Sequence, residues 1–256
     1  MPRANKNKEA AVGSQNRTVS PNEAKSALTH CIKLQRPIMM WGAPGIGKSD
    51  IVKQIADAEG RDVIDIRLPL WEPTDIKGIP YYNAKENNMV WASPAELPTD
   101  PKSNAIVFLD ELNSAAPAVQ AAAYQLILNR RVGQYHLPEG VSIVAAGNRD
   151  SDKGVTYRMP APLANRFVHV ELRVDFEDWM EWATNQHIHA DVVGYCTFAK
   201  QDLYDFDPRG SSRSFATPRS WSFVSQLLSD DLPESTLTDL VAGCVGEGLA
   251  VKFMNH

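Results

Sequence analysis

The chain has 256 residues, of which 43% are hydrophobic and 22% charged, as in ordinary soluble globular proteins. Its net charge of −5 gives no global argument for a nucleic-acid surface, and its three scattered cysteines exclude a disulfide framework and a zinc site. No apolar run approaches the roughly 20 residues that cross a bilayer, so we expect a cytoplasmic protein with no membrane segment.

Residues 1–19 contain four basic residues, one acidic residue and few apolar ones. Such a segment cannot bury a core, so we predict a disordered tail. A basic arm can contact a polyanion, although a solvated tail is the simpler interpretation. Order is expected to begin at Ser20, because Ser20, Pro21 and Glu23 match a capping box at the start of a helix that runs toward Leu34.

Five short apolar segments are typical of buried strands, and amphipathic or alanine-rich segments separate them. Strands that alternate with helices indicate a parallel sheet covered on both faces. The sequence therefore predicts an α/β fold. The expected strands are residues 37–41, 63–68, 105–109, 141–146 and 167–172.

Two inserts interrupt this alternation, and the strands then stop. Residues 78–92 place aromatic side chains on both sides of a polar turn and predict a β-hairpin, while residues 131–140 predict a second loop or hairpin. After Asp175 the pattern is helical, so we expect a core at residues 20–174 and a small helical domain at 175–256. The helices expected in the second domain are residues 176–185, 191–200, 219–228 and 237–253, the last weakened by three glycines.

A glycine-rich loop follows the first predicted strand and precedes a helix. Its sequence fits G-x-x-x-x-G-K-[ST] in full, and it lies in the strand–loop–helix context that a phosphate-binding loop requires. The glycines let backbone N–H groups surround a phosphate, Lys48 is expected to reach the β- and γ-phosphates, and Ser49 to bind Mg²⁺. The expected nucleotide-binding residues are Gly42, Ala43, Pro44, Gly45, Ile46, Gly47, Lys48, Ser49 and Asp50.

An acidic pair, Asp110 and Glu111, ends the apolar strand that follows. Ligands of open α/β sheets bind at the carboxyl ends of the strands, which is where this pair is expected. We predict that Asp110 belongs to the Mg²⁺ shell and that Glu111 orients and deprotonates an attacking water. The alternative is that the pair is simply two solvated acids after a core strand. This alternative is disfavoured because the pair follows a phosphate-binding loop in the correct order.

Three further polar residues are candidates by position. Asn148 follows the strand at 141–146 and can position the same water, although Gly-Asn is also an ordinary turn. Arg166 precedes the last strand and can reach a phosphate across a subunit boundary, or simply cap a helix. Arg219 lies in the first turn of a helix that Thr217 and Pro218 begin, where it faces a nucleotide or only solvent.

These five elements, in this order, resemble those of the AAA+ ATPases and, within them, the MoxR-like branch. The resemblance covers about residues 21–228. It implies a P-loop core followed by a small helical lid. It also implies that Lys48 and Ser49 form the Walker A pair and that Asp110 and Glu111 form the Walker B pair. The roles that it implies for the other three are sensor 1 for Asn148, arginine finger for Arg166 and sensor 2 for Arg219.

The resemblance further implies a ring, expected to be a hexamer, that binds ATP and Mg²⁺ at its subunit interfaces. Hydrolysis would then remodel or activate a partner protein, in many relatives one with a von Willebrand factor A domain. The two inserts match positions where this branch faces a pore or a partner. Nucleic acid and membrane are not expected partners.

Two other functions compete with a remodelling ATPase. A DNA-directed AAA+ module is supported only by the basic tail and by Arg130 and Arg131, and the acidic net charge argues against it. A nucleotide-binding scaffold that performs no work is disfavoured by the intact pair Asp110 and Glu111, because a pure binder does not need Glu111.

Overall fold

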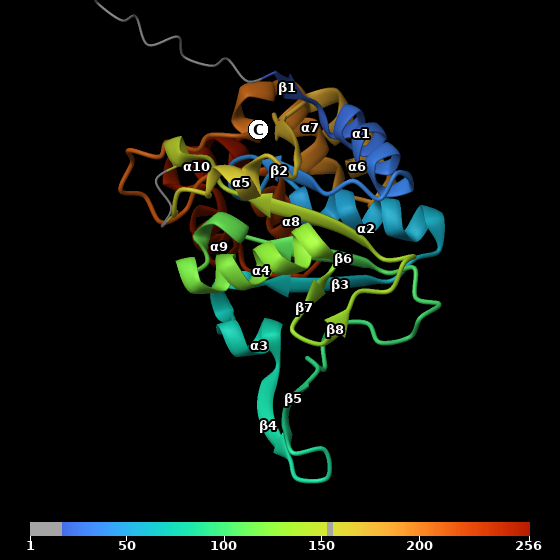
Figure 1. The fold of residues 1–256 in the computed structure, drawn as a ribbon. Coiled ribbons are helices and arrows are strands. Elements are labelled where there is room, and N and C mark those ends of the chain that lie inside the picture. The colour runs from blue at the N-terminus through green and yellow to red at the C-terminus, as the bar shows by residue number, and fades with distance from the viewer. Residues whose placement is uncertain (1–16, 153–155) are drawn as a thin grey trace, which may run out of the picture.

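The computed structural model describes residues 17–152 and 156–256, so nearly all of the predicted tail lies outside the described residues. Within these ranges six parallel strands form one sheet, in the order β1-β10-β2-β9-β6-β3 (Figure 1). All five predicted strands are confirmed. The strands are β1 (Thr18–Val19), β2 (Ile38–Trp41), β3 (Val63–Arg67), β6 (Ile106–Asp110), β9 (Ser142–Gly147) and β10 (Val168–Leu172).

The first strand corrects the prediction that residues 1–19 form an irregular tail. Thr18 and Val19 pair with Glu171 and Leu172 of β10, and the N–H of Arg173 donates to the carbonyl of Val19. Without this partner the outer edge of β10 would leave its backbone groups unpaired. Two residues are too short to show the strand period, which is why the pattern missed β1.

Helices cover both faces of the sheet, as the sequence predicts. Side chains of β6 alternate, with Ile106 and Phe108 packing toward α1 and α2 and with Val107 and Leu109 packing toward α4. The predicted capping box at Ser20 is confirmed. The core helices are α1 (Pro21–Lys33), α2 (Lys48–Glu59), α3 (Pro73–Lys77), α4 (Pro117–Asn129) and α5 (Ala161–Ala164), with 3₁₀ turns at Leu68–Leu70, Leu112–Ser114 and Asp150–Asp152.

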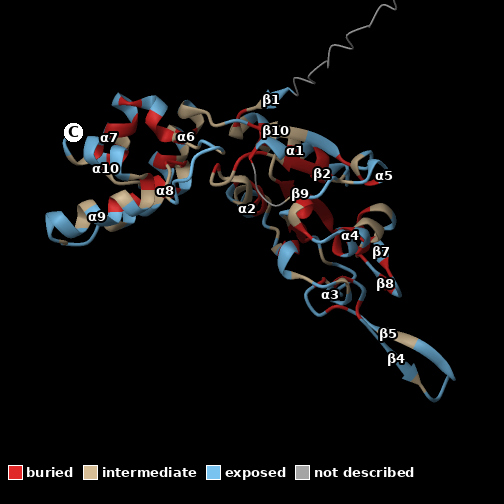
Figure 2. Ribbon diagram, turned by 90° about the vertical axis from the view of Figure 1, so that its left-hand side faces the viewer, coloured by how far each residue is buried: buried red, intermediate tan, exposed pale blue. Residues whose placement is uncertain are grey.

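Both predicted inserts are hairpins. The longer one joins β4 (Ile79–Asn83) to β5 (Asn88–Ala92) and projects from the body, while β7 (Arg131–Val132) and β8 (Tyr135–His136) form the shorter one (Figures 1 and 2). Gly78 begins the long hairpin with φ of +82°, and a Cβ there would overlap the carbonyl oxygen of Ala92. Glycine is therefore required at the base of this hairpin.

The last third of the chain is a helical lid with its own hydrophobic core around Trp179, Tyr195 and Trp221. The single helix predicted at 237–253 is wrong, because Gly246 adopts φ of +94° and divides it in two. The lid contains α6 (Phe176–Asn185), α7 (Ala190–Phe198), α8 (Pro218–Leu227), α9 (Glu234–Val245) and α10 (Glu247–Met254), with a 3₁₀ turn at Lys200–Leu203. No helix in the described ranges has the length and apolar character of a membrane span.

A buried hydrogen-bond network holds the centre of the lid. The hydroxyl of Tyr195 donates to Oδ2 of Asp202 at 2.7 Å, and the indole N–H of Trp221 donates to the Asp202 carbonyl at 2.9 Å. Burial is the main cause of the raised pKa of Tyr195, so its hydroxyl stays protonated and donates. Tyr204 offers a contrast, because its buried hydroxyl has no hydrogen-bond partner among the described residues.

These two tyrosines provide a matched test of the network. Tyr195→Phe should lower the free energy of unfolding by about 1 to 3 kcal/mol, because a buried carboxylate loses a donor. Tyr204→Phe should leave it unchanged or slightly raised, since the hydroxyl that it removes is buried without a partner. Chemical denaturation of both variants measures the difference, and equal losses would contradict the network.

Candidate active site

The predicted phosphate-binding loop lies between β2 and α2, as its motif requires. Gly45 and Gly47 have φ of +76° and +92°, which glycine adopts without strain, and α2 begins at Lys48. The first N–H groups of this 12-residue helix have no carbonyl partner within the helix, so they face the loop as anion donors. The loop therefore fits a phosphate group.

The lid contacts this loop directly. The N–H of Arg219 donates to the Gly45 carbonyl at 3.2 Å, and a Cβ on Gly45 would come within 2.7 Å of Thr217 Oγ1. Thr217 also caps α8, as predicted, by accepting from the N–H of Ser220. Gly45 thus serves close packing of the lid as well as the turn of the loop, a role that the motif alone does not reveal.

Lys48 joins the ends of two strands that are distant in sequence. Its Nζ donates to the carbonyls of Gly42 at 2.8 Å and Ala43 at 2.9 Å and to Oδ1 of Asn148 at 3.3 Å. Burial lowers the pKa of Lys48 to about 8, and the nearby Asp110 carboxylate partly opposes that shift. The structure therefore brings Asn148 to the phosphate-binding loop.

Ser49 and Asp110 lie together, as predicted for an Mg²⁺ site. Ser49 Oγ donates to Asp110 Oδ2 at 3.5 Å, so a hydroxyl and a carboxylate oxygen face the same space. Oxygen ligands of this kind, few in number and completed by phosphate oxygens, are what Mg²⁺ prefers. The donor set of this chain therefore fits a magnesium ion.

Glu111 has a strained backbone. Its φ and ψ of 54° and 36° are left-handed, a region that costs a non-glycine residue about 1 kcal/mol or more. The residue is exposed, and its N–H donates to Asp110 Oδ1 at 2.9 Å. The turn thus directs the Glu111 side chain away from the core while Asp110 stays at the strand end.

Sequence reasoning missed Asn113, which is buried beside the site. Its amide pairs with the backbone of Asn148, donating to the carbonyl at 2.8 Å and accepting from the N–H at 3.2 Å. A Cβ on Gly147 would overlap Asn113 Oδ1, so Gly147 admits this pairing. A polar residue three positions after Asp110 was the available signal, but its partner lies 35 residues away.

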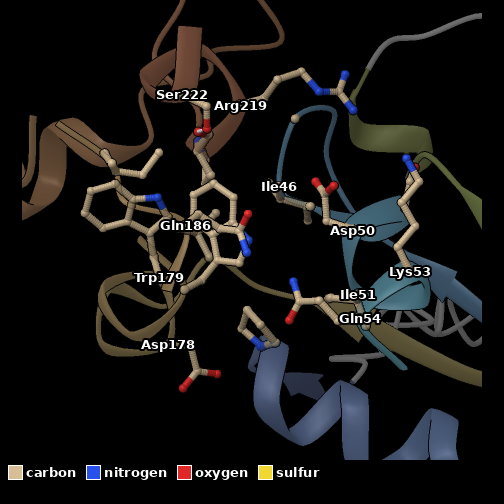
Figure 3. Close-up of a pocket in the computed structure, with 18 of the residues that line it drawn as sticks. Ile46, Asp50, Ile51, Lys53, Gln54, Asp178, Trp179, Gln186, Arg219 and Ser222 are labelled. Atoms are coloured by element: carbon tan, nitrogen blue, oxygen red, sulfur yellow. Dashed lines mark hydrogen bonds between the residues drawn. The ribbon is translucent and has the colours of Figure 1, made fainter. Parts of the chain in front are cut away.

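A cavity of about 610 Å³ opens between the loop and the lid (Figure 3). Ile46 and Asp50 line it on the core side, and Trp179 and Ser222 line it on the lid side. Trp179 is buried, and its indole N–H has no hydrogen-bond partner among the described residues. This mixed apolar and polar lining beside a phosphate-binding loop fits a nucleotide.

The two predicted arginines lie in different places. Arg219 is exposed at the rim of this cavity, and its charge contributes to lowering the pKa of Lys48 (Figure 3). Arg166 is exposed after α5 and does not line the cavity. Within the described residues the Arg166 side chain has neither a hydrogen bond nor an ion pair. The structure therefore groups Arg219 with the loop and leaves Arg166 outside it.

Arg130, part of the weak argument for DNA binding, is occupied within the protein. Its Nη2 donates to the carbonyls of Pro138 at 2.7 Å and Val141 at 2.8 Å, where it closes the loop after β8. Its guanidinium therefore serves the fold.

Residues 37–169, more than half of the chain, match the ATPase family associated with various cellular activities (AAA). The chain belongs to this family. Its members are ATPases, so this AAA chain is an enzyme that binds a nucleotide, and Mg²⁺ is generally required. The family match includes the phosphate-binding loop, the acidic pair and Arg166.

Curated relatives include two midasins. The chain is 28% identical over 186 residues to midasin of Giardia intestinalis, covering 69% of this chain and 4% of that protein. It is 26% identical over 167 residues to midasin of Dictyostelium discoideum, covering 59% of this chain and 3% of that protein. The AAA chain therefore spans only a small part of the curated relatives it matches.

Solved structures share the fold. A mutant of RuvB from Thermotoga maritima has a TM-score of 0.50 at 18% identity, covering 93% of this chain and 73% of that chain. NtrX from Brucella abortus has a TM-score of 0.50 at 14% identity, covering 81% of this chain and 48% of that chain. At these identities the likeness establishes the architecture of a P-loop sheet with a helical lid.

The position of Asn113 generates a prediction. Asn113→Ala should lower the rate of ATP hydrolysis about tenfold. The substitution removes both hydrogen bonds from the Asn113 amide to the Asn148 backbone, so the side chain of Asn148 is displaced. ATP affinity should stay within about twofold, since the loop is unchanged and Lys48 keeps its bonds to the carbonyls of Gly42 and Ala43. Steady-state kinetics and calorimetry measure the two, with Asn129→Ala at the exposed end of α4 as the control. An unchanged turnover would contradict the positioning of Asn148 by Asn113.

Proposed function

We propose that the AAA chain binds ATP with Mg²⁺ in the cavity beneath the lid and hydrolyses it there. The observation that carries this proposal is the meeting of Lys48, Ser49, Asp110 and Asn148 at the carboxyl ends of β2, β6 and β9. These are the ends at which open α/β sheets bind ligands. The cavity and the α2 N-terminus adjoin this point and suit the rest of a nucleotide.

Each residue then has a distinct role. The loop from Gly42 to Asp50 surrounds the phosphates, with Lys48 supplying a cation and Ser49 and Asp110 holding the metal. Mg²⁺, when bound, neutralises charge on the phosphate oxygens. Glu111 accepts a proton from the attacking water, and Asn148 orients that water from the neighbouring strand. Arg219 stabilises phosphate charge from the lid.

We place Arg166 in the site of a neighbouring subunit. It is exposed, lies outside its own cavity and makes no side-chain contact with a charge among the described residues. AAA proteins typically form oligomeric rings, and a free arginine at a subunit boundary can stabilise developing phosphate charge across it. This role makes hydrolysis depend on assembly, and a hexamer is the ring that we propose.

We assign the work of the ring to remodelling a protein partner, as in MoxR-like ATPases. The long hairpin supports this assignment, because Ile79, Tyr81, Tyr82 and Met89 are exposed on a projecting ribbon (Figure 2). Apolar and aromatic side chains of this kind suit contact with a polypeptide. A protein with a von Willebrand factor A domain is the candidate partner. The separate lid core supports a division into an ATPase core at 20–174 and a lid at 175–256.

Two substitutions separate binding from hydrolysis. Lys48→Ala should weaken ATP binding at least about tenfold, because the phosphates lose a charge-assisted donor. Glu111→Gln should keep ATP affinity and lose nearly all turnover, since an amide has the same shape but cannot act as the base. Calorimetry and phosphate release measure the two properties. Normal ATP binding by Lys48→Ala would remove the loop assignment, and wild-type turnover by Glu111→Gln would remove the base.

Mixing two inactive proteins tests the role of Arg166. Arg166→Ala should bind ATP normally and hydrolyse it roughly a thousandfold more slowly, as expected for an arginine finger. A mixture of Arg166→Ala and Glu111→Gln should regain activity, because some interfaces then combine an intact Glu111 with an intact Arg166. If both residues served the same subunit, every site would carry one lesion. Absence of recovery in rings shown by native mass spectrometry to have exchanged subunits would contradict action in trans.

A further inference from the structure

The turn that carries Arg166 is tied to the strand that leads into the phosphate-binding loop. Arg166 lies between α5, whose last residue is Ala164, and β10. The Ala164 carbonyl accepts from the N–H of Phe167 at 3.2 Å and bonds Nε2 of His169 at 2.7 Å. Phe167 is buried in the core, so the turn has an apolar anchor and a polar one.

The second anchor engages both nitrogens of the imidazole. Trp41 Nε1 donates to His169 Nδ1 at 2.9 Å, and the two rings lie edge to edge with their planes 15° apart. An indole N–H can only donate and a carbonyl can only accept. These partners suit the imidazole tautomer that carries its hydrogen on Nε2, and both ring nitrogens are engaged.

Trp41 places this link beside the nucleotide site. It is the last residue of β2, immediately before Gly42, and it lies diagonally across from His169 on the adjacent parallel strand. A continuous path therefore runs from the loop through the indole and the imidazole to the carbonyl that precedes Arg166. The path stays within one subunit, although Arg166 is assigned to the site of the next.

We propose that His169 is a positioning residue for Arg166, and that Trp41 connects its orientation to the phosphate-binding loop of the same subunit. This inference rests on the proposed trans action of Arg166. In this arrangement a displacement of the loop moves Trp41, and Trp41 turns the imidazole of His169. The imidazole in turn shifts the carbonyl of Ala164, two residues before Arg166. The conformation of the phosphate-binding loop in one subunit thereby adjusts the position of the Arg166 that enters the neighbouring subunit's site.

Directional mixing of subunits tests this inference. The parent mixture pairs Glu111→Gln, which donates Arg166, with Arg166→Ala, which supplies the competent site. Adding His169→Ala to the donor should lower the recovered turnover about tenfold or more, because a displaced catalytic group is costly. Adding it instead to the Arg166→Ala chain should leave recovery unchanged. A purely structural role would reduce activity in both placements.

Conservative variants sharpen the test. His169→Gln keeps a donor near the Nε2 position and should restore much of the turnover, whereas His169→Asn is too short to reach Ala164 and should not. Trp41→Phe keeps an aromatic ring and removes the N–H, so in the donor it should lower turnover several-fold with ATP affinity unchanged. These variants also guard against a His169→Ala protein that fails to fold.

The outcomes separate the two proposals. If the parent mixture does not recover, Arg166 does not act in trans and the proposed function fails at that point. If the parent recovers and the His169→Ala donor supports it equally well, His169 does not position Arg166. If the loss appears only when His169→Ala is in the site-supplying chain, His169 serves its own subunit's loop, which overturns the inference.

Discussion

The ammonium group of Lys48 is the point on which the active site converges. It is partly buried, and burial alone would disfavour its charge. Carbonyl oxygens of Gly42 and Ala43, the amide oxygen of Asn148 and the nearby carboxylate of Asp110 partly offset that cost. Three separate strands must end at this level of the sheet to supply those oxygens. The buried ammonium of Lys48 therefore requires the register of β2, β9 and β6, and so does the hydrophobic core.

Close to this cation the chain contains two unfavourable features that regular helices and strands lack. Glu111 adopts a left-handed backbone, and Asn113 is a polar side chain in a buried turn. Glu111 follows Asp110 directly and Asn113 lies three residues after it, where the chain leaves the sheet beside the end of β9. The bidentate pairing of Asn113 with the Asn148 backbone repays its burial, since each amide group meets a partner. The same two hydrogen bonds therefore satisfy the buried amide of Asn113 and hold Asn148 in place.

Much of this arrangement was predictable from the sequence because its signals are local. The strand-to-loop motif at Gly42, the apolar run before Asp110 and the capping residues at Ser20 and Thr217 each lie within a few residues. Contacts between distant segments were not predictable, such as Asn113 with Asn148 or Trp41 with His169. Their partners are set by strand order, which periodicity does not encode. The break at Gly246 was missed because a glycine can also stay inside a helix at modest cost.

The packing of Thr217 against Gly45 has a mechanical consequence. The absence of a side chain on Gly45 lets the first turn of α8 pack on the backbone of the loop, where the Arg219 N–H donates to the Gly45 carbonyl. Because α8 is packed into one core with α9 and α10, a rotation of the lid about this contact would carry all three helices together. A lever multiplies displacement with distance from its pivot. A small rotation at Gly45 would therefore give its largest displacement at α9, which lies at the outer end of the lid (Figure 2).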